Sequence, residues 1–351
     1  MMVLKTSLWC AFLALLAVPV ARAHHGMGGE FDTKRTVEFA AVISSVTWAN
    51  PHVRMELTED AGKSTAKTWL IETNSVSSLS RVGITRDIAA VGAPIRVAGF
   101  PSLTSDRRLF MTHMLLPDGR EVAFQDNGKA RWQGVPVGND DRTRGKIVEA
   151  DFSKRPTSIF SVWTTVYGNL GSHNTQPAAS AGYPATARGL QEAAAVDMVR
   201  DHPLNDCKPK GMPVAMFAPY PVQLIKDGAN IKVRLEEYDA ERLIVMTSKH
   251  DDSRVAPSRL GYSTGVWEGD KLVVKTTKID YRYLGIQTQP TPVIQGPRIS
   301  TVETFQLSAD HNQLNYTVVI TDPDYLTKPL TVSKFWQYQP GAKVDRYNCT
   351  R

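Results

Sequence analysis

The chain has 351 residues, more than one hydrophobic core usually organises, so two domains are the default expectation. Its 41 basic and 35 acidic residues leave a net charge of only +6, and the basic residues are scattered rather than clustered. This charge pattern argues against nucleic acid as a partner.

Residues 1–23 have the pattern of a cleavable secretory signal peptide. Lys5 precedes an apolar run over residues 8–20, and Ala21-Arg22-Ala23 is the small-x-small pattern that signal peptidase reads. The run is too short to span a bilayer comfortably, and no later stretch is long and apolar enough, so we expect no stable membrane anchor. The protein is therefore predicted to be periplasmic or secreted.

Residues 24–126 are predicted to form an OB-like, five-stranded β-barrel. β-Branched and alternating segments indicate strands, and a short helix is expected over residues 75–82. The five strands are expected over residues 36–48, 52–58, 67–73, 93–100 and 108–116. Three strands, a helix and two strands is the element order of the OB fold.

Residues 157–351 are predicted to form an antiparallel, lipocalin-like β-barrel, which makes the whole chain mainly β. A polar segment rich in Gly, Asp and Arg over residues 127–156 is expected to link the two domains. Beyond it, roughly nine strands are joined largely by short turns, and the first of them carries Trp163. A helix is expected over residues 185–200. A barrel of about eight strands leaves room inside for one small ligand.

Two cysteines, Cys207 and Cys349, remain once Cys10 leaves with the signal peptide. An even number of cysteines in an oxidising compartment predicts a disulfide between them. The alternative, a reactive or metal-binding thiol pair, calls for neighbouring His or Cys ligands, and none flanks either residue.

Several motifs resemble uncharacterised families of exported bacterial proteins. The mature start His24-His25-Gly26 and the turn Asn50-Pro51-His52 resemble the opening of one such family. Five further segments resemble a second uncharacterised module that is often fused to the first. They are residues 207–213, 220–221, 261–274, 322–329 and 347–349. This module has His-Pro where His250 is followed here by Asp251. The resemblance implies a two-module organisation and no particular activity.

The mature N-terminus offers a candidate copper site. Cleavage after Ala23 would leave His24 with both a free amine and an imidazole. Together with a second imidazole, these nitrogen donors form the histidine brace that suits Cu(II). The candidate partners are His25, His52 and His113.

Met111 and Met114 flank His113, and soft thioethers favour Cu(I). The structural interpretation carries more weight, because methionines on strands commonly fill a core. Met111 and His113 share one face of a strand and Met114 takes the other, so the three cannot all converge on one metal.

A second candidate site lies in the C-terminal barrel, where aromatic side chains and a buried carboxylate would make a small-molecule site. The candidate ligand-binding residues are Tyr262, Trp267, Glu303, Tyr316 and Trp336 on strands and His250 in a loop. Aromatic residues on strands are equally ordinary core residues, and Glu303 could face solvent.

The leading functional hypothesis is an exported binding protein that holds a small apolar molecule in the C-terminal barrel and copper in the N-terminal domain. The alternative is an exported enzyme, a lyase, isomerase or hydrolase, acting inside that barrel. A third interpretation is a structural or interaction module. A buried pair of titratable groups in a cavity would favour the enzyme. An apolar cavity would favour the binding protein, and a solidly packed barrel would favour the structural or interaction module.

Overall fold

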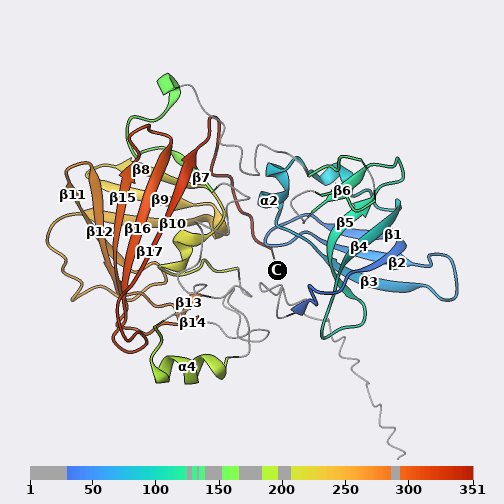
Figure 1. Ribbon diagram of the computed structural model, residues 1–351, viewed down its shortest axis with the longest axis horizontal. Coiled ribbons are helices and arrows are strands. Elements are labelled where there is room, and N and C mark those ends of the chain that lie inside the picture. Colours follow the sequence, from blue (N-terminus) through green and yellow to red (C-terminus); the bar gives the residue numbers. More distant parts are fainter. Residues whose placement is uncertain are drawn as a thin grey trace, which may run out of the picture.

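The computed structural model describes most of the chain between residues 30 and 350. The described ranges are 30–124, 129–132, 134–138, 152–165, 184–196, 207–285 and 293–350. Within them the chain forms two closed β-barrels, which Figure 1 shows side by side. The predicted signal peptide, His24, His25 and most of the predicted linker lie outside the described residues.

The N-terminal barrel has the strand order of an OB fold, which confirms the predicted class. Its strands are β1 (Val37–Thr47), β2 (Arg54–Glu59), β3 (Lys67–Glu72), β4 (Pro94–Pro101) and β5 (Arg108–Leu115). β1 pairs antiparallel with β2 and β4, and a parallel pairing of β3 with β5 closes the barrel. Helix α2 (Val76–Arg81) and the short helix η1 (Arg86–Ile88) lie between β3 and β4, and β6 (Glu121–Ala123) extends the sheet beside β5.

Local sequence explains why these elements form and close around a core. On β2, Met55 and Leu57 are buried while Glu56 between them is exposed, the alternation of a strand with one face inside. Helix α2 begins after Ser75, whose hydroxyl accepts a hydrogen bond from the backbone N–H of Ser78 at 3.1 Å. Serine at this position satisfies a backbone donor that the helix itself leaves free.

The C-terminal domain is a closed barrel of nine strands, which confirms the predicted β-barrel class. They are β7 (Val162–Thr164), β8 (Val222–Asp227), β9 (Asn230–Leu235), β10 (Ala240–Met246), β11 (Tyr262–Glu268), β12 (Lys271–Thr277), β15 (Ser300–Leu307), β16 (Gln313–Thr321) and β17 (Leu330–Tyr338). Neighbours are antiparallel except β10 and β11, which run parallel. Residues 247–261 carry the chain back along the barrel between these two strands, and a parallel pairing requires such a long connection.

Several smaller elements surround this barrel. They are η4 (Phe152–Lys154), α4 (Ala187–Ala194), η5 (Val214–Phe217), η6 (Glu237–Asp239), β13 (Tyr283–Gly285) and β14 (Val293–Ile294). β13 and β14 form a separate two-stranded sheet that is not among the predicted strands. α4 lies within the helix predicted over residues 185–200 and is shorter than it, and residues 197–200 lie outside the described residues. α4 buries the small residues Gly189 and Ala193, whereas Leu190 is 63% exposed.

The two barrels meet through the C-terminal tail, residues 339–350, and through helix α2. Figure 1 shows the chain leaving β17 and running to the C-terminus between the barrels. Cys349 in this tail forms the predicted disulfide with Cys207, with the Cα atoms 5.8 Å apart. The backbone of Asn50 in the N-terminal barrel accepts a hydrogen bond from Thr350 N at 2.9 Å, and its side-chain amide donates to the carbonyl of Tyr347. The Asn-Pro-His turn singled out in the sequence therefore docks the tail.

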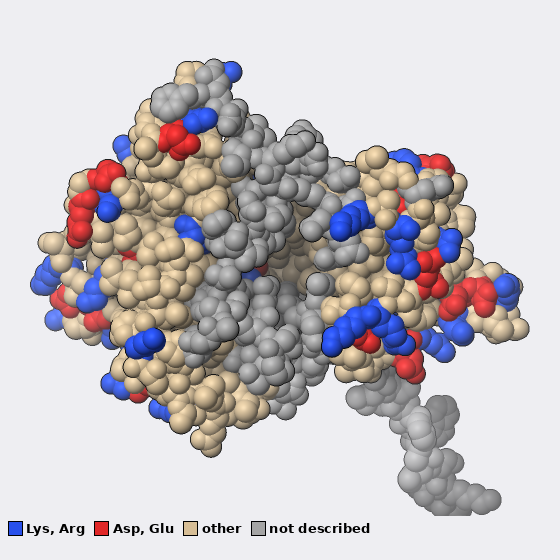
Figure 2. All heavy atoms as spheres, in the orientation of Figure 1, with Lys and Arg blue, Asp and Glu red and all other residues tan. Residues whose placement is uncertain are grey.

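Two features of the described residues bear on partners: the length of their helices, and the distribution of charge on the face drawn in Figure 2. In the described ranges, no helix is both long and apolar enough to cross a bilayer. On the face drawn in Figure 2, basic and acidic side chains are intermingled over both barrels.

Candidate functional site

A buried ionic cluster crosses the interior of the C-terminal barrel. Arg242 on β10 and Glu303 on β15 form a two-pronged ion pair, with Arg242 Nη1 2.8 Å from Glu303 Oε1 and a second, close contact between Nη2 and Oε2. Tyr316 on β16 donates its hydroxyl to Glu303 Oε1 at 2.9 Å. Arg242 Nε also donates to Ser263 at 2.9 Å, and Arg242 and Glu303 are 2% and 0% exposed.

This cluster is saturated with internal partners. Both carboxylate oxygens of Glu303 accept hydrogen bonds, and Thr276 supplies a further donor at 3.1 Å. Burial, and then the charge of Glu303, raise the pKa of Tyr316 well above its ordinary value, so its hydroxyl stays a donor. An ion pair satisfied in this way positions strands β10, β15 and β16 and offers no free group to a ligand.

Lys334 on β17 is a buried amine with different surroundings. It is 4% exposed, and its Nζ donates to the backbone carbonyl of Met216 in η5 at 2.9 Å. Nζ lies 4.1 Å from the centre of the Trp336 ring and 5.5 Å from that of Phe217. Burial lowers the pKa of Lys334 from 10.5 to about 7, because an ammonium ion is poorly solvated there.

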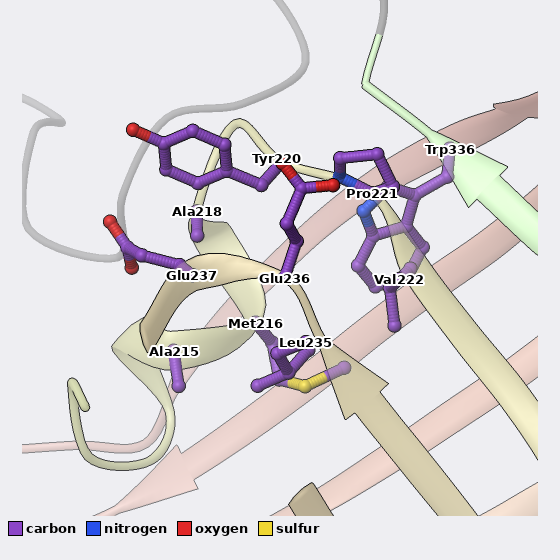
Figure 3. A pocket seen from close by; sticks show the side chains of 10 residues that line it. All are labelled: Ala215, Met216, Ala218, Tyr220, Pro221, Val222, Leu235, Glu236, Glu237 and Trp336. Atoms are coloured by element: carbon purple, nitrogen blue, oxygen red, sulfur yellow. The ribbon is translucent and has the colours of Figure 1, made fainter. Parts of the chain in front are cut away.

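A small hollow lies beside Lys334, at the end of the barrel that η5 plugs. Its volume is about 190 Å³ including space open to solvent, and its enclosed part is about the size of one water molecule. Figure 3 shows side chains from η5, β8, β9 and β17 around it. The lining residues are Ala215, Met216, Ala218, Tyr220, Pro221, Val222, Leu235, Glu236, Glu237 and Trp336.

The rim of the hollow faces the N-terminal barrel. Tyr220 donates its hydroxyl to Ser75 at 3.0 Å, and Glu236 pairs with Arg81 at the end of α2. Burial raises the pKa of Glu236, while the charge of Arg81 opposes that shift. The hollow is thus walled by apolar and aromatic side chains and bordered by two paired carboxylates. Glu236 pairs with Arg81 of the N-terminal barrel, and Glu237 pairs with Lys210 of the C-terminal domain.

The structure brings together three of the six predicted ligand-binding residues. Glu303, Tyr316 and Trp336 all point into the barrel, and the rings of Tyr316 and Trp336 lie 5.3 Å apart. Trp336 also lines the hollow. These three form the inner wall behind Lys334.

The other three predicted residues lie elsewhere. His250 bridges Thr264 at 2.7 Å and Thr277 at 2.8 Å, and these threonines face outward because their strand neighbours Ser263 and Thr276 face the interior. The ring of Tyr262 lies 5.2 Å from that of His250, and Trp267 is 45% exposed. Burial, followed by the charge of Lys275, lowers the pKa of His250.

The predicted copper ligands in the described part of the N-terminal barrel are engaged in hydrogen bonds. His52 Nδ1 lies 2.8 Å from the carbonyl of Thr73. His113 is 3% exposed, and its two ring nitrogens lie 3.0 Å from Thr112 Oγ1 and 3.1 Å from the carbonyl of Lys129. Among the described residues, no group of three or more His, Cys, Asp or Glu is placed to hold a metal ion. Copper binding through His24, aided by His25 and by His52 or His113, stays a prediction, which Cu(II) titration of the processed chain would test.

Sequence reasoning missed the buried cations, although two of them carried a signal. Lys334 lies on the same face of β17 as Leu330, Val332 and Trp336, because all four occupy every second position. An inward-facing lysine was therefore readable from the strand pattern. Arg242 likewise lies on the same face of β10 as Ala240 and Ile244. Their partners were not readable, because they come from strands far apart in the chain.

A second buried charge cluster lies in the N-terminal barrel. Arg108 on β5 pairs with Glu30 at 2.6 Å and with Glu72 on β3. Oε2 of each glutamate is buried and has no hydrogen-bond partner among the described residues. Burial raises the pKa of Glu30 from 4.5 to about 7, opposed by the charge of Arg108 and reinforced by that of Glu72.

This shift predicts that Glu30 makes the folded protein less stable as the pH rises from about 4.5 to about 7. Because the pKa is higher in the folded than in the unfolded state, the folded state binds more protons between about pH 4.5 and pH 7, and stability falls across that window. Urea unfolding at pH 5 and pH 8 should show this loss, and E30Q should reduce it by about 1–3 kcal/mol. Replacing the exposed Glu56 by Gln should leave the loss unchanged. An equal loss in E30Q and the wild type would contradict the prediction.

Comparison with known proteins adds a grouping for the N-terminal part. The family model described as "Family of unknown function (DUF6152)" matches residues 12–109. The match ends inside β5 and includes the Asn-Pro-His turn, so this part of the chain is similar to an uncharacterised family. No curated protein and no solved structure shows a significant match to the chain.

Proposed function

We propose that this protein is an exported small-molecule-binding protein whose ligand occupies the plugged end of the C-terminal barrel. The observation that carries the proposal is the hollow beside Lys334, with its walls of Met216, Leu235 and Trp336. Apolar walls with a few polar groups are the usual make-up of a small-molecule site. They favour a ligand with an apolar body.

Export is part of the same proposal. The signal-peptide pattern over residues 1–23 supports it, and so does the disulfide between Cys207 and Cys349, since disulfides persist mainly in oxidising compartments. These two features are independent, because one is a targeting pattern and the other a covalent bond of the folded chain.

A ligand larger than water requires η5 to shift outward. Lys334 donates to the Met216 carbonyl within this single turn, and Gln295 donates to the carbonyl of Met212, just before the turn, at 2.9 Å. The four residues of η5 are buried and belong to the hydrophobic core of the barrel. An entering apolar molecule would replace that packing with its own.

The second candidate function is an exported enzyme, and the observation favouring it is also Lys334. A buried amine with a pKa of about 7 is present in both protonation states at neutral pH, which suits general acid–base or nucleophilic chemistry. The saturated Arg242–Glu303 pair has no such freedom.

Filling the hollow is expected to abolish binding of an apolar probe. The test uses the mature chain, the fluorescent probe anilinonaphthalene sulfonate, and the variants Ala218→Leu and Ala218→Phe, which place a larger side chain in the hollow. We expect at least about tenfold weaker binding, because the probe and the new side chain compete for the same space. Fluorescence titration measures the affinity.

Ala61→Phe, on the exposed β2–β3 turn, is the matched control and should bind the probe as the wild type does. Near-ultraviolet circular dichroism and urea unfolding establish that each variant is folded, since overpacking a core costs about 1–3 kcal/mol. Unchanged binding in a folded Ala218→Leu would overturn the proposal.

A further inference from the structure

Three buried cations in the C-terminal barrel differ in their counter-ions. Arg242 has Glu303, and Lys210 has Glu237 at 2.8 Å. Lys334 makes no ion pair with any residue that the structure describes. Its contacts are one backbone carbonyl and the faces of two aromatic rings.

The carboxylate of Glu303, inside the same barrel, is committed to another partner. Lys334 lies directly opposite Tyr316 across the β16–β17 pairing. The hydroxyl of Tyr316 points to Glu303, and both oxygens of that carboxylate are bound to Arg242. The barrel therefore contains a carboxylate that could neutralise a lysine, yet its geometry assigns this carboxylate to the arginine.

A buried amine without a counter-ion favours its neutral form. Carbonyl and ring contacts compensate only part of the lost hydration of an ammonium ion, and desolvation is the cause of the lowered pKa of Lys334. At pH 7 a lysine with a pKa of about 7 is roughly half neutral, whereas an ordinary exposed lysine is neutral in roughly one molecule in a few thousand. The neutral amine is the nucleophile.

The amine lies behind the wall of the hollow, since Lys334 is not itself a lining residue. Two residues that contact Lys334, Met216 and Trp336, line the hollow. Met216 belongs to η5, so the movement that admits a ligand also breaks the hydrogen bond that holds Nζ.

We propose that Lys334 is a nucleophilic residue that forms an imine with a small apolar aldehyde or ketone entering through the hollow. The inference rests on the proposed ligand site and names the ligand class for it. The nitrogen forms a bond to the carbonyl carbon, the carbon–oxygen bond breaks, and one water molecule leaves with the carbonyl oxygen and the two amine hydrogens. No oxidant or reductant takes part.

The surroundings of Lys334 favour retention of the imine. Phe217 and Trp336 cover the amine, and the aromatic packing around it excludes the water that would hydrolyse the product. Before water attacks, η5 would have to open again. The site is therefore suited to holding a carbonyl compound covalently and reversibly.

Reductive trapping tests the inference. The mature chain is incubated with propanal and cyanoborohydride at pH 7, and peptide mass spectrometry follows modification of each lysine with time. We expect Lys334 to react at least about tenfold faster than the exposed Lys328, because of its larger neutral fraction. The rate at Lys334 should rise between pH 6 and pH 8 and level off above.

Lys210 is the internal control, since it is equally buried but paired with a carboxylate, and it should remain unmodified. Reaction of Lys334 no faster than Lys328, or only after unfolding in urea, would overturn the inference. The variant K334M separates the two proposals. If K334M and the wild type bind the fluorescent probe equally and Lys334 is not trapped, the proposed binding site is supported and imine formation is ruled out. If no probe binds, the proposed function itself falls.

Discussion

Replacing Glu303 with leucine is expected to lower the free energy of unfolding by about 3–5 kcal/mol, the largest effect of any single substitution considered for this protein. Arg242 is 2% exposed and depends on Glu303 for a two-pronged ion pair, so the variant buries a guanidinium without its counter-ion. Tyr316 and Thr276 would also lose the acceptor for their hydroxyl groups. Urea unfolding at pH 7, with the transition midpoint and slope compared between variants, measures the loss.

The double variant R242M/E303L is the decisive companion. Removing both charges leaves no unpaired ion, so most of the lost stability should return. D118N breaks the exposed Arg120–Asp118 pair and should leave the midpoint unchanged. A single E303L variant as stable as the wild type would show that Arg242 finds another partner or reaches water, contrary to the geometry described above.

Removing the disulfide with C207S/C349S is expected to cost about 4–5 kcal/mol in the chain-entropy model, with smaller losses common in practice. The bond joins residues 142 positions apart, and closing so long a loop restricts the unfolded chain strongly. Thermal and urea unfolding of the mature chain, compared with the double serine variant, measure the effect.

The same variant should release the C-terminal tail. Tyr347 and Thr350 bind Asn50 of the N-terminal barrel, and Cys349 is the covalent anchor between these two contacts. Trypsin cleavage after the exposed Arg346 should therefore become faster in the serine variant. A thiol assay on denatured, unreduced mature wild type should find no free thiol. Two free thiols, or equal cleavage rates, would contradict the prediction.

The strand patterns of both barrels were readable because alternation is a local property. On β2, Met55 and Leu57 alternate with Glu56, and the sequence around them suffices to predict a half-buried strand. The parallel pairing of β10 with β11 was not predicted, because it depends on where residues 247–261 carry the chain and not on the residues of either strand. The β13–β14 sheet was missed for a similar reason, since each strand is too short to show a period.

The candidate site shows the same division. The sequence indicated that Glu303 is a possible interior carboxylate, but it could not show that Arg242 occupies it, because the two residues lie 61 positions apart. His250 and Trp267 had suitable chemistry, yet His250 bonds to outward-facing threonines and Trp267 is 45% exposed at the end of its strand. Chemistry is a property of the residue, whereas convergence on one point is a property of the fold.

The sequence by itself determined the two barrels and the cysteine pair, because strand periodicity, turn residues and an even cysteine count act locally or by simple exclusion. Only the tertiary structure decided which charges are neutralised. Arg242 pairs with Glu303 and Lys210 pairs with Glu237, whereas Lys334 contacts a backbone carbonyl and two aromatic rings. The physical reason is that a buried charge depends on atoms within a few ångströms, and barrel closure brings those atoms together from strands that are distant in the chain.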